Sequence, residues 1–198
     1  MKIGIDNGHG IGCPNGSPDK MLMEYLFTRA VSSEVASQLI SLGYDVSLIT
    51  PELQDISINT RVARVNKLCH IYGTQNVFVV SIHADAKGNG KKWRNDAKGW
   101  GVLVADTASA NSRKLANCLF AEAEKAGRTM RRPKPTQNYW ERDNVGILKR
   151  TLCPAVLTES GFMTNKEECE WLLSEEGVKT CAKIHVDGII NYINNLQK

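Results

Sequence analysis

The sequence predicts a single three-layer α/β domain, in which helices cover both faces of a mostly parallel central sheet. Short runs rich in β-branched residues alternate with longer stretches whose apolar residues recur at helical spacing, an order typical of parallel sheets with crossover helices. Residues 77–83 form the most hydrophobic run in the chain, which indicates a strand buried on both faces at the centre of such a sheet.

The first half of the chain contains three of the predicted strands and two of the helices. The first helix carries Val31, Val35 and Leu39 at helical spacing and has a plausible stop at Gly43, and Pro51 closes the strand that follows. In chain order these elements are a strand at 2–6, a helix at 23–42, a strand at 46–49, a helix at 57–72 and a strand at 77–83.

The second half predicts two more strands and three helices, interrupted by two irregular stretches. The polar stretch 87–98 is expected to be a loop, and the stretch 128–144, which contains prolines, is expected to be irregular. The last predicted strand delivers Glu159 at its carboxyl end. The elements are a strand at 102–105, a helix at 109–126, a strand at 155–158 and helices at 166–174 and 176–194.

Length and composition narrow the class of protein. The 198 residues, 42% of them hydrophobic, suffice for one buried core and exclude intrinsic disorder, so we expect one domain over residues 1–198. The net charge of +4 suits an acidic polymer or a small anionic substrate but is too weak to argue for nucleic acid. No apolar run approaches the roughly 18 residues that a membrane span needs. We expect a monomer.

The start of the chain and its cysteines indicate where the protein is made. Met1 and Lys2 lead straight into the first strand, so no signal peptide is visible and we expect a protein made in the cytoplasm. No two of the six cysteines form a Cys-x-x-Cys pair, and we expect free thiols rather than a disulfide framework. The cysteines are Cys13, Cys69, Cys118, Cys153, Cys169 and Cys181.

Three polar residues lie at or just past predicted strand ends, where ligands bind in parallel sheets. They are His9 in a Gly-His-Gly turn, His83 and Glu159, and Glu24 opens the first helix fifteen residues after His9. Two imidazoles and one carboxylate are the ligands of a catalytic zinc site with an open fourth position. Such a site also needs a carboxylate that does not bind the metal but takes a proton from water, and Glu159 is placed for that.

Taken singly, each of these residues has an ordinary structural interpretation. A histidine after a strand usually packs or forms a hydrogen bond. A glutamate that starts a helix is favoured there by the helix dipole, and Glu159 could cap a helix. Spacing by itself therefore leaves the zinc site open as a hypothesis.

Four motifs in order carry a resemblance to a known family. They are residues 6–10 (DNGHG), Glu24, residues 81–85 (SIHAD) and residues 159–165 (ESGFMTN). With these motifs the chain resembles the zinc-dependent N-acetylmuramoyl-L-alanine amidases of the type called Amidase_3, from residue 2 to about residue 192.

The resemblance implies roles for individual residues and a reaction. It implies that His9, Glu24 and His83 bind one Zn²⁺ per chain and that Glu159 is the catalytic general base. The implied substrate is peptidoglycan, and the implied reaction is hydrolysis of the amide between the lactyl group of N-acetylmuramic acid and L-alanine. The protein would then act on the cell wall as an autolysin or endolysin, after phage-type release or with an export segment that the sequence lacks.

Further residues are candidates for supporting roles. Asp6 or Asp85 is expected to orient a histidine ligand, as metal sites generally require. Arg61, Lys149 and Arg150 are candidates for binding the carboxylates of the stem peptide, and Arg61 is equally a candidate for a structural anchor.

Three alternatives remain open at this stage. A zinc peptidase that cuts stem peptides would use the same site, and a wall-binding module would keep the fold without turnover. A cysteine amidase is a weaker hypothesis, because Cys181 and His185 are one helical turn apart but no oxyanion-forming turn is visible nearby. Cys13 follows His9 closely and could approach the metal, although a loop role is the simpler expectation.

Overall fold

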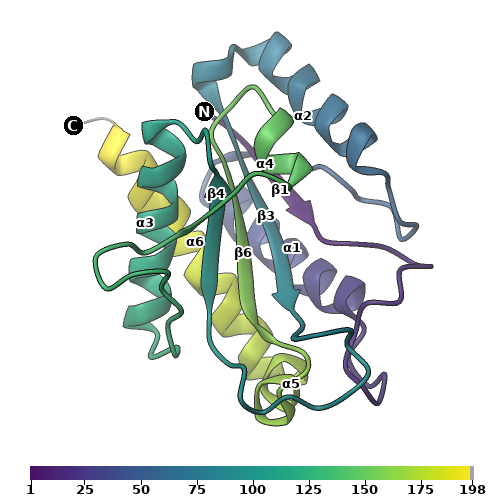
Figure 1. The fold of residues 1–198 in the computed structure, drawn as a ribbon. Helices are drawn as coiled ribbons and strands as arrows, with labels where there is room; N and C mark the ends of the chain where they lie inside the picture. Colours follow the sequence, from purple (N-terminus) through teal and green to yellow (C-terminus); the bar gives the residue numbers. More distant parts are fainter. Residues whose placement is uncertain (197–198) are drawn as a thin grey trace.

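The computed structural model describes residues 1–196 and confirms the predicted α/β class, with one six-stranded sheet between helices (Figure 1). The predicted boundary at residue 198 lies outside the described residues. The strands are β1 (Lys2–Asn7), β2 (Asp45–Leu48), β3 (Val77–Asp85), β4 (Gly101–Ala105), β5 (Trp140–Arg142) and β6 (Ala155–Phe162). The helices are α1 (Glu24–Ser41), α2 (Ile58–Tyr72), the 3-10 helix η1 (Thr74–Asn76), α3 (Ala110–Lys125), α4 (Gly146–Arg150), α5 (Lys166–Leu173) and α6 (Glu175–Leu196).

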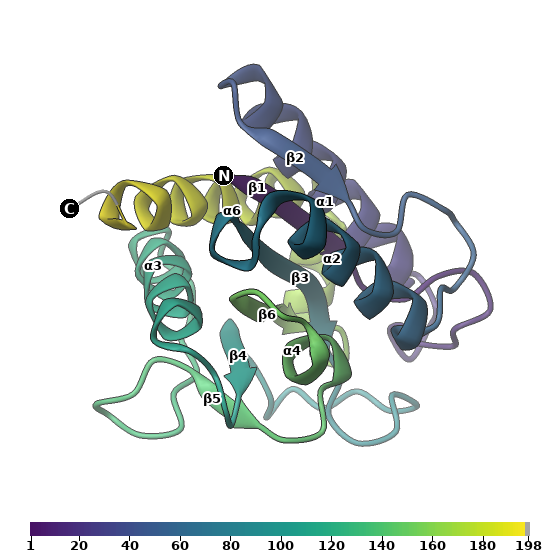
Figure 2. The same ribbon diagram turned by 90° about the horizontal axis from the view of Figure 1, so that it is seen from above.

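The sheet is mostly parallel, as predicted. The strand order is β2-β1-β3-β6-β4-β5, and Figure 2 shows the strands following one another across the molecule in this order. Every neighbouring pair is parallel except β4 and β6, which run in opposite directions. Because β1, β3 and β6 are parallel neighbours, their carboxyl ends meet at one edge of the sheet.

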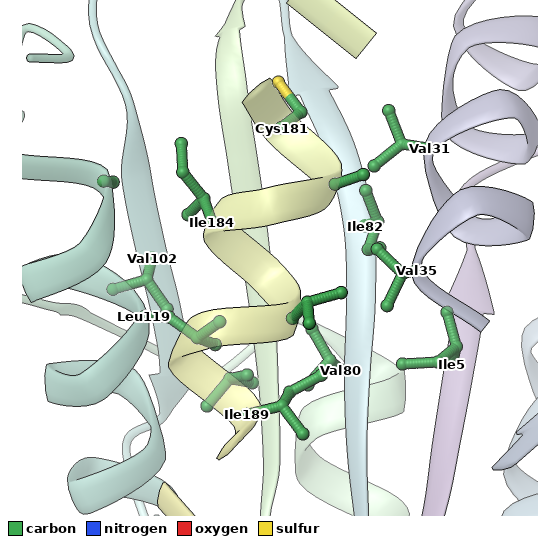
Figure 3. Packing of buried hydrophobic residues seen from close by; sticks show 14 of the residues in the cluster. Ile5, Val31, Val35, Val80, Ile82, Val102, Leu119, Cys181, Ile184 and Ile189 are labelled. Atoms are coloured by element: carbon green, nitrogen blue, oxygen red, sulfur yellow. The ribbon is translucent and has the colours of Figure 1, made fainter. Parts of the chain in front are cut away.

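Two hydrophobic clusters hold helices against the two faces of the sheet. On one face, residues of α1, α3 and α6 pack against alternate residues of the strands, and Figure 3 shows Val80 and Ile82 of β3 among Val35 of α1 and Ile189 of α6. On the other face α2 and α4 cover the strands, with Val65 of α2 fully buried. Burying one such side chain contributes about 1.5–3 kcal/mol.

Side-chain caps set the starts of three helices. Ser57 accepts a hydrogen bond from the backbone N–H of Thr60 at the start of α2, and Ser109 does the same for Ser112 at the start of α3. Asn165 caps α5. Each cap satisfies a backbone N–H that has no partner inside the helix, which stabilises the helix by about 0.5–2 kcal/mol.

Three short elements were not predicted. The stretch expected to be irregular contains β5, whose three residues pair with β4 and are too few to show an alternating pattern. Helix α4 has five residues and η1 has three, and neither is long enough for a helical period to be visible. Strand β6 continues beyond the predicted end to Phe162, so Glu159 lies inside the strand and not after it.

Within residues 1–196, no helix is both long enough and apolar enough to cross a membrane.

Candidate active site

The carboxyl ends of β1, β3 and β6 bring three of the predicted site residues together. His83 pairs with Glu159 across β3 and β6, and His9 follows the end of β1 by two residues. The backbone N–H of Gly8 donates a 3.0 Å hydrogen bond to the carbonyl oxygen of Ile82, so the chain after β1 stays beside β3. The loops that leave this edge of the sheet surround the end of β3 (Figure 1).

His9 lies in a tight turn that its neighbours keep in place. Its φ of 58° is in the left-handed region, which costs a residue with a β-carbon on the order of 1–3 kcal/mol. A β-carbon on Gly8 would lie 2.5 Å from the His83 ring, so this position requires glycine. Arg29 and Arg61 both donate hydrogen bonds to the carbonyl oxygen of His9, and these bonds hold the turn.

Glu24 joins the two histidines. It is the first residue of α1, where the helix dipole favours a negative charge, and its side chain is only 2% exposed. One carboxylate oxygen, Oε1, lies 3.0 Å from His83 Nδ1 and accepts a hydrogen bond from the backbone N–H of Ala84. The other oxygen, Oε2, lies 3.3 Å from His9 Nε2.

Burial and the charges of neighbouring groups shift the pKa values of all three residues. Burial by itself raises the pKa of Glu24, but the hydrogen bond and charge of His83 and the charge of His9 outweigh it, so this pKa is lowered. Burial lowers the pKa of His9. Burial would also lower the pKa of His83, but its hydrogen bond to Glu24 raises it overall. Because a histidine must lose its proton to bind a metal, a metal ion competes with a proton for His83, and this competition grows as the pH falls.

The donor set fits a zinc ion. His9, Glu24 and His83 each offer one ligand atom, and these atoms lie within 4.8 Å of one another. Zinc bonds of about 2.0–2.2 Å in tetrahedral geometry place neighbouring donor atoms about 3.4 Å apart. The separations of 3.0 Å and 3.3 Å between the Glu24 oxygens and the two histidines are close to this value.

Glu159 is a carboxylate beside this group but not part of it. It faces the same side of the sheet as His83, and its Oε2 is buried with no hydrogen-bond partner within the described residues. Burial raises the pKa of Glu159 to about 8, the carboxylates of Asp85 and Glu24 contribute to the rise, and His83 and Arg131 oppose it. A buried carboxylate with a free acceptor oxygen and a pKa near neutrality has the properties of a general base.

A cavity of about 720 Å³ lies over these residues. This volume is in the usual range for sites that bind small molecules. His9, Glu24, His83 and Glu159 line it together with the loop of residues 14–20 and the segment of residues 84–91. The site is therefore a hollow with a metal-binding group and a separate carboxylate in its wall.

A family comparison shows the class of protein to which the chain belongs. The model of the family described as N-acetylmuramoyl-L-alanine amidase, Amidase_3, matches residues 3–191. The chain belongs to this family. As a member, the amidase is a hydrolase that acts on the peptidoglycan amide, and zinc dependence is a known property of the family.

Individual relatives agree with the family match. The amidase is 26% identical over 196 residues to N-acetylmuramoyl-L-alanine amidase CwlM of Bacillus licheniformis. This match covers 98% of the present chain and 69% of the relative. It is also 24% identical over 199 residues to the endolysin of Bacillus phage SPP1, and this match covers 99% of the present chain and 67% of the endolysin. The crystal structure of the N-acetylmuramyl-L-alanine amidase Ami1 of Mycobacterium smegmatis has the same fold, with a TM-score of 0.84, 21% identity, and 98% and 97% of the two chains covered.

Asp6 and Arg61 form a buried ion pair behind the turn of His9. The Asp6 carboxylate accepts a 2.8 Å hydrogen bond from Arg61 and a 2.6 Å hydrogen bond from Ser81. Arg61 also donates to the carbonyl oxygens of Asn7 and His9. These bonds hold the backbone of the turn, and none of them reaches a histidine ring.

The other predicted supporting residues lie in different places. Asp85 lines the cavity, and its carboxylate is paired with Arg131 at 2.9 Å. Lys149 and Arg150 lie on α4, outside the residues that line the cavity. Lys149 is paired with Asp106, and Arg150 donates a hydrogen bond to Asn59.

Two residues that contact the site carried no signal in the sequence. The side-chain amide of Asn15 lies 3.0 Å from His9 Nε2 and 3.2 Å from Glu24 Oε2, although Asn15 sits in a loop without periodicity. Arg131 reaches Asp85 from a stretch that was predicted only as irregular. Contacts made by loop residues depend on how the loop folds back, and no local pattern reports that.

The structure does not favour cysteine chemistry. All six cysteines lie within the described residues and are free thiols, as expected. His185 contacts the carbonyl oxygen of Cys181 and the hydroxyl of Thr158, and not the Cys181 thiol. Burial raises the pKa of Cys181 to about 12, so this thiol is not activated as a nucleophile.

We expect the substitution Glu159→Gln to stabilise the zinc-free amidase at neutral and alkaline pH. The pKa of Glu159 is raised to about 8 by burial, so between about pH 4.5 and 8 the folded protein holds a proton that the unfolded chain has released. Stability of the wild type therefore falls as the pH rises through this window, and glutamine removes that loss. The gain at pH 8 should be on the order of 2–4 kcal/mol.

Urea unfolding at pH 5 and pH 8 measures this difference. The exposed Glu170 provides the control, because Glu170→Gln should change stability little at either pH. A stability gain of Glu159→Gln that is equal at both pH values would show that burial of the charged carboxylate is not its cause.

Proposed function

We propose that this chain hydrolyses the amide between the lactyl group of N-acetylmuramic acid and the L-alanine of peptidoglycan, with one Zn²⁺ held by His9, Glu24 and His83 and with Glu159 as the general base. Family membership supports the reaction. The observation that carries the residue roles is the convergence of three metal-ligand atoms within 4.8 Å beside a carboxylate that takes no part in the group.

The proposed roles divide the chemistry between the ion and Glu159. When bound, the ion supplies a Lewis acid that polarises the scissile carbonyl and acidifies the attacking water. Glu159, which lines the cavity, accepts the proton of that water on its carboxylate and returns it to the leaving amine of L-alanine. The raised pKa of Glu159 suits both steps, because the carboxyl can hold a proton near neutral pH and also release it.

The same arrangement argues against a module that only binds the cell wall. A binding module has no use for a buried carboxylate whose oxygen has no partner, because leaving such a group unpaired costs about 1–3 kcal/mol or more. Action on a substrate is one explanation for such a group, and the position of Glu159 beside the metal-binding residues in the cavity supports it. We therefore place the catalytic step, and not only recognition, in this cavity.

We propose that two lysines in the cavity wall bind the carboxylates of the stem peptide. Lys20 and Lys91 line the cavity from two different loops, and the ammonium group of Lys20 donates to the carbonyl oxygen of Pro14. Arg61, Lys149 and Arg150 stay predictions in this role. Arg61 is buried in the ion pair with Asp6, which supports the alternative of a structural anchor.

A single chain supplies the whole proposed site. His9, Glu24, His83 and Glu159 all come from one copy, so we propose that the protein acts as a monomer. Its substrate places its action at the cell wall.

Product analysis by mass spectrometry tests the proposed reaction. Purified peptidoglycan is treated with the protein, with a metal chelator present in one sample and absent in another. We expect soluble stem peptides that begin with L-alanine, their loss in the chelator, and their return when Zn²⁺ is added back. Shortened stems that remain attached to sugar would replace the amidase with a peptidase, and no soluble product would favour a binding module.

A further inference from the structure

Cys13 contacts a predicted metal ligand from the side away from the metal. Its Sγ lies 3.1 Å from His9 Nδ1. The other ring nitrogen of His9, Nε2, faces Glu24 at 3.3 Å and is therefore the atom directed at the metal-binding group. The Cys13 side chain is half-buried in the loop that follows the turn of His9.

The chemistry of imidazole gives this contact a function. A neutral imidazole has one N–H, so a histidine that binds a metal through Nε2 carries its hydrogen on Nδ1. Histidine ligands almost always donate that N–H to an acceptor, which fixes the ring and its tautomer. Within residues 1–196, the one hydrogen-bond partner of His9 Nδ1 is the Cys13 sulfur. Asn15 contacts the opposite nitrogen, Nε2.

Backbone hydrogen bonds fix the loop that carries Cys13. The backbone N–H of Cys13 donates a 3.1 Å hydrogen bond to the carbonyl oxygen of Gly10, which closes a turn between the histidine and the cysteine. The N–H of Ile11 donates a 2.7 Å hydrogen bond to the carbonyl oxygen of Leu53, which ties the turn to the segment after β2. These backbone hydrogen bonds hold the Cys13 backbone beside the turn of His9, from where its side chain reaches the ring.

We infer that Cys13 is a positioning residue that accepts the Nδ1–H of His9 and so holds His9 Nε2 toward the zinc ion. The inference rests on the zinc site proposed above. Sulfur is a weak acceptor, whereas the usual acceptor at this place in a metal site is a carboxylate or a carbonyl oxygen. Replacing the sulfur with a carboxylate should therefore preserve the function or strengthen it.

Zinc affinity of the metal-free protein tests this role without peptidoglycan. We expect Cys13→Ala to weaken Zn²⁺ binding by about 10–100-fold in competition with a chromophoric chelator, the usual effect of losing such a partner. Cys13→Asp should bind Zn²⁺ at least as tightly as the wild type, and Cys13→Ser should lie between Cys13→Ala and Cys13→Asp. Cys118→Ala is the control, because Cys118 lies on α3 and not in the cavity.

A cobalt spectrum separates a positioning role from direct ligation. With Co²⁺ in place of Zn²⁺, the wild type should show no sulfur-to-cobalt charge-transfer band, and Cys13→Ala should not change that region. A band that disappears in Cys13→Ala would make Cys13 a ligand and overturn the inference. Equal zinc affinity of the wild type and Cys13→Ala would also overturn it.

The design remains decisive if one variant folds poorly. Far-ultraviolet circular dichroism checks each variant, and Cys13→Ser carries the comparison with Cys13→Asp if Cys13→Ala does not fold. Failure of the proposed reaction appears as a missing peptidoglycan product, whereas failure of this inference appears as unchanged zinc affinity. The two results are therefore distinguishable.

Discussion

Glu159→Gln is expected to lower the rate of peptidoglycan hydrolysis by about 10²–10⁴-fold while the protein still binds one Zn²⁺. Glutamine keeps the shape of the side chain but cannot take a proton from the attacking water. The proposed metal ligands are untouched, because Glu159 lies outside the group of His9, Glu24 and His83, and its Oε2 has no hydrogen-bond partner among residues 1–196. Release of stem peptides measures the rate, and metal analysis of the dialysed protein measures zinc content.

Two comparisons make this result specific to the carboxylate. Glu170→Gln changes an exposed glutamate of α5 in the same way and should leave rate and zinc content unchanged. A Glu159→Gln protein that turns over at a near-normal rate would remove Glu159 from the mechanism. Loss of zinc in that variant would instead place Glu159 in the metal-binding group.

His83→Ala is expected to lose both zinc and turnover. The ring of His83 lies 3.0 Å from Glu24 and supplies one of three donors, so its removal leaves two donors for the ion. Loss of a hydrogen-bond partner of a ligand usually weakens metal binding by about 10–100-fold, and loss of the ligand itself should weaken zinc binding more than this. Titration of the metal-free protein with Zn²⁺ measures it.

A second histidine provides the matched control for this variant. His70 lies exposed on α2, and His70→Ala should retain zinc and activity. Normal zinc affinity of His83→Ala would exclude His83 from the ligand set. Together with Glu159→Gln, the His83→Ala variant separates metal binding from proton transfer, because only one of the two should remain metallated.

Much of the fold was predictable because its signals are local. Residues 77–83 form the most hydrophobic run in the chain, which indicates a strand buried on both faces, and β3 lies in the interior of the sheet. Helix α1 was predictable from Val31, Val35 and Leu39, which recur at helical spacing and are all fully buried. The alternation of strands and helices predicted a mostly parallel sheet. The structure confirms this prediction, since β4 and β6 form the one antiparallel pair of the six described strands.

The candidate site was predictable in its members but not in its geometry. Histidines and a glutamate at predicted strand ends, together with Glu24, indicated which side chains would converge, because the carboxyl ends of parallel strands share one edge. The contact between Cys13 and His9 was not predictable, because it depends on the path of a loop with no periodic pattern. Strand β5 was not predicted, because its three residues show no pattern of their own and only the pairing with β4 defines it as a strand.

The sequence by itself determined the α/β class, the order of most elements, and the residues offered for a metal ion and a general base. The tertiary structure decided how these residues act on one another. The pKa of Glu159 rises to about 8 because burial and the carboxylates of Asp85 and Glu24 disfavour its charge, although His83 and Arg131 oppose the rise. These partners lie on other elements, far away along the chain. Electrostatic energies depend on distance in space and on burial, so only the folded chain sets them.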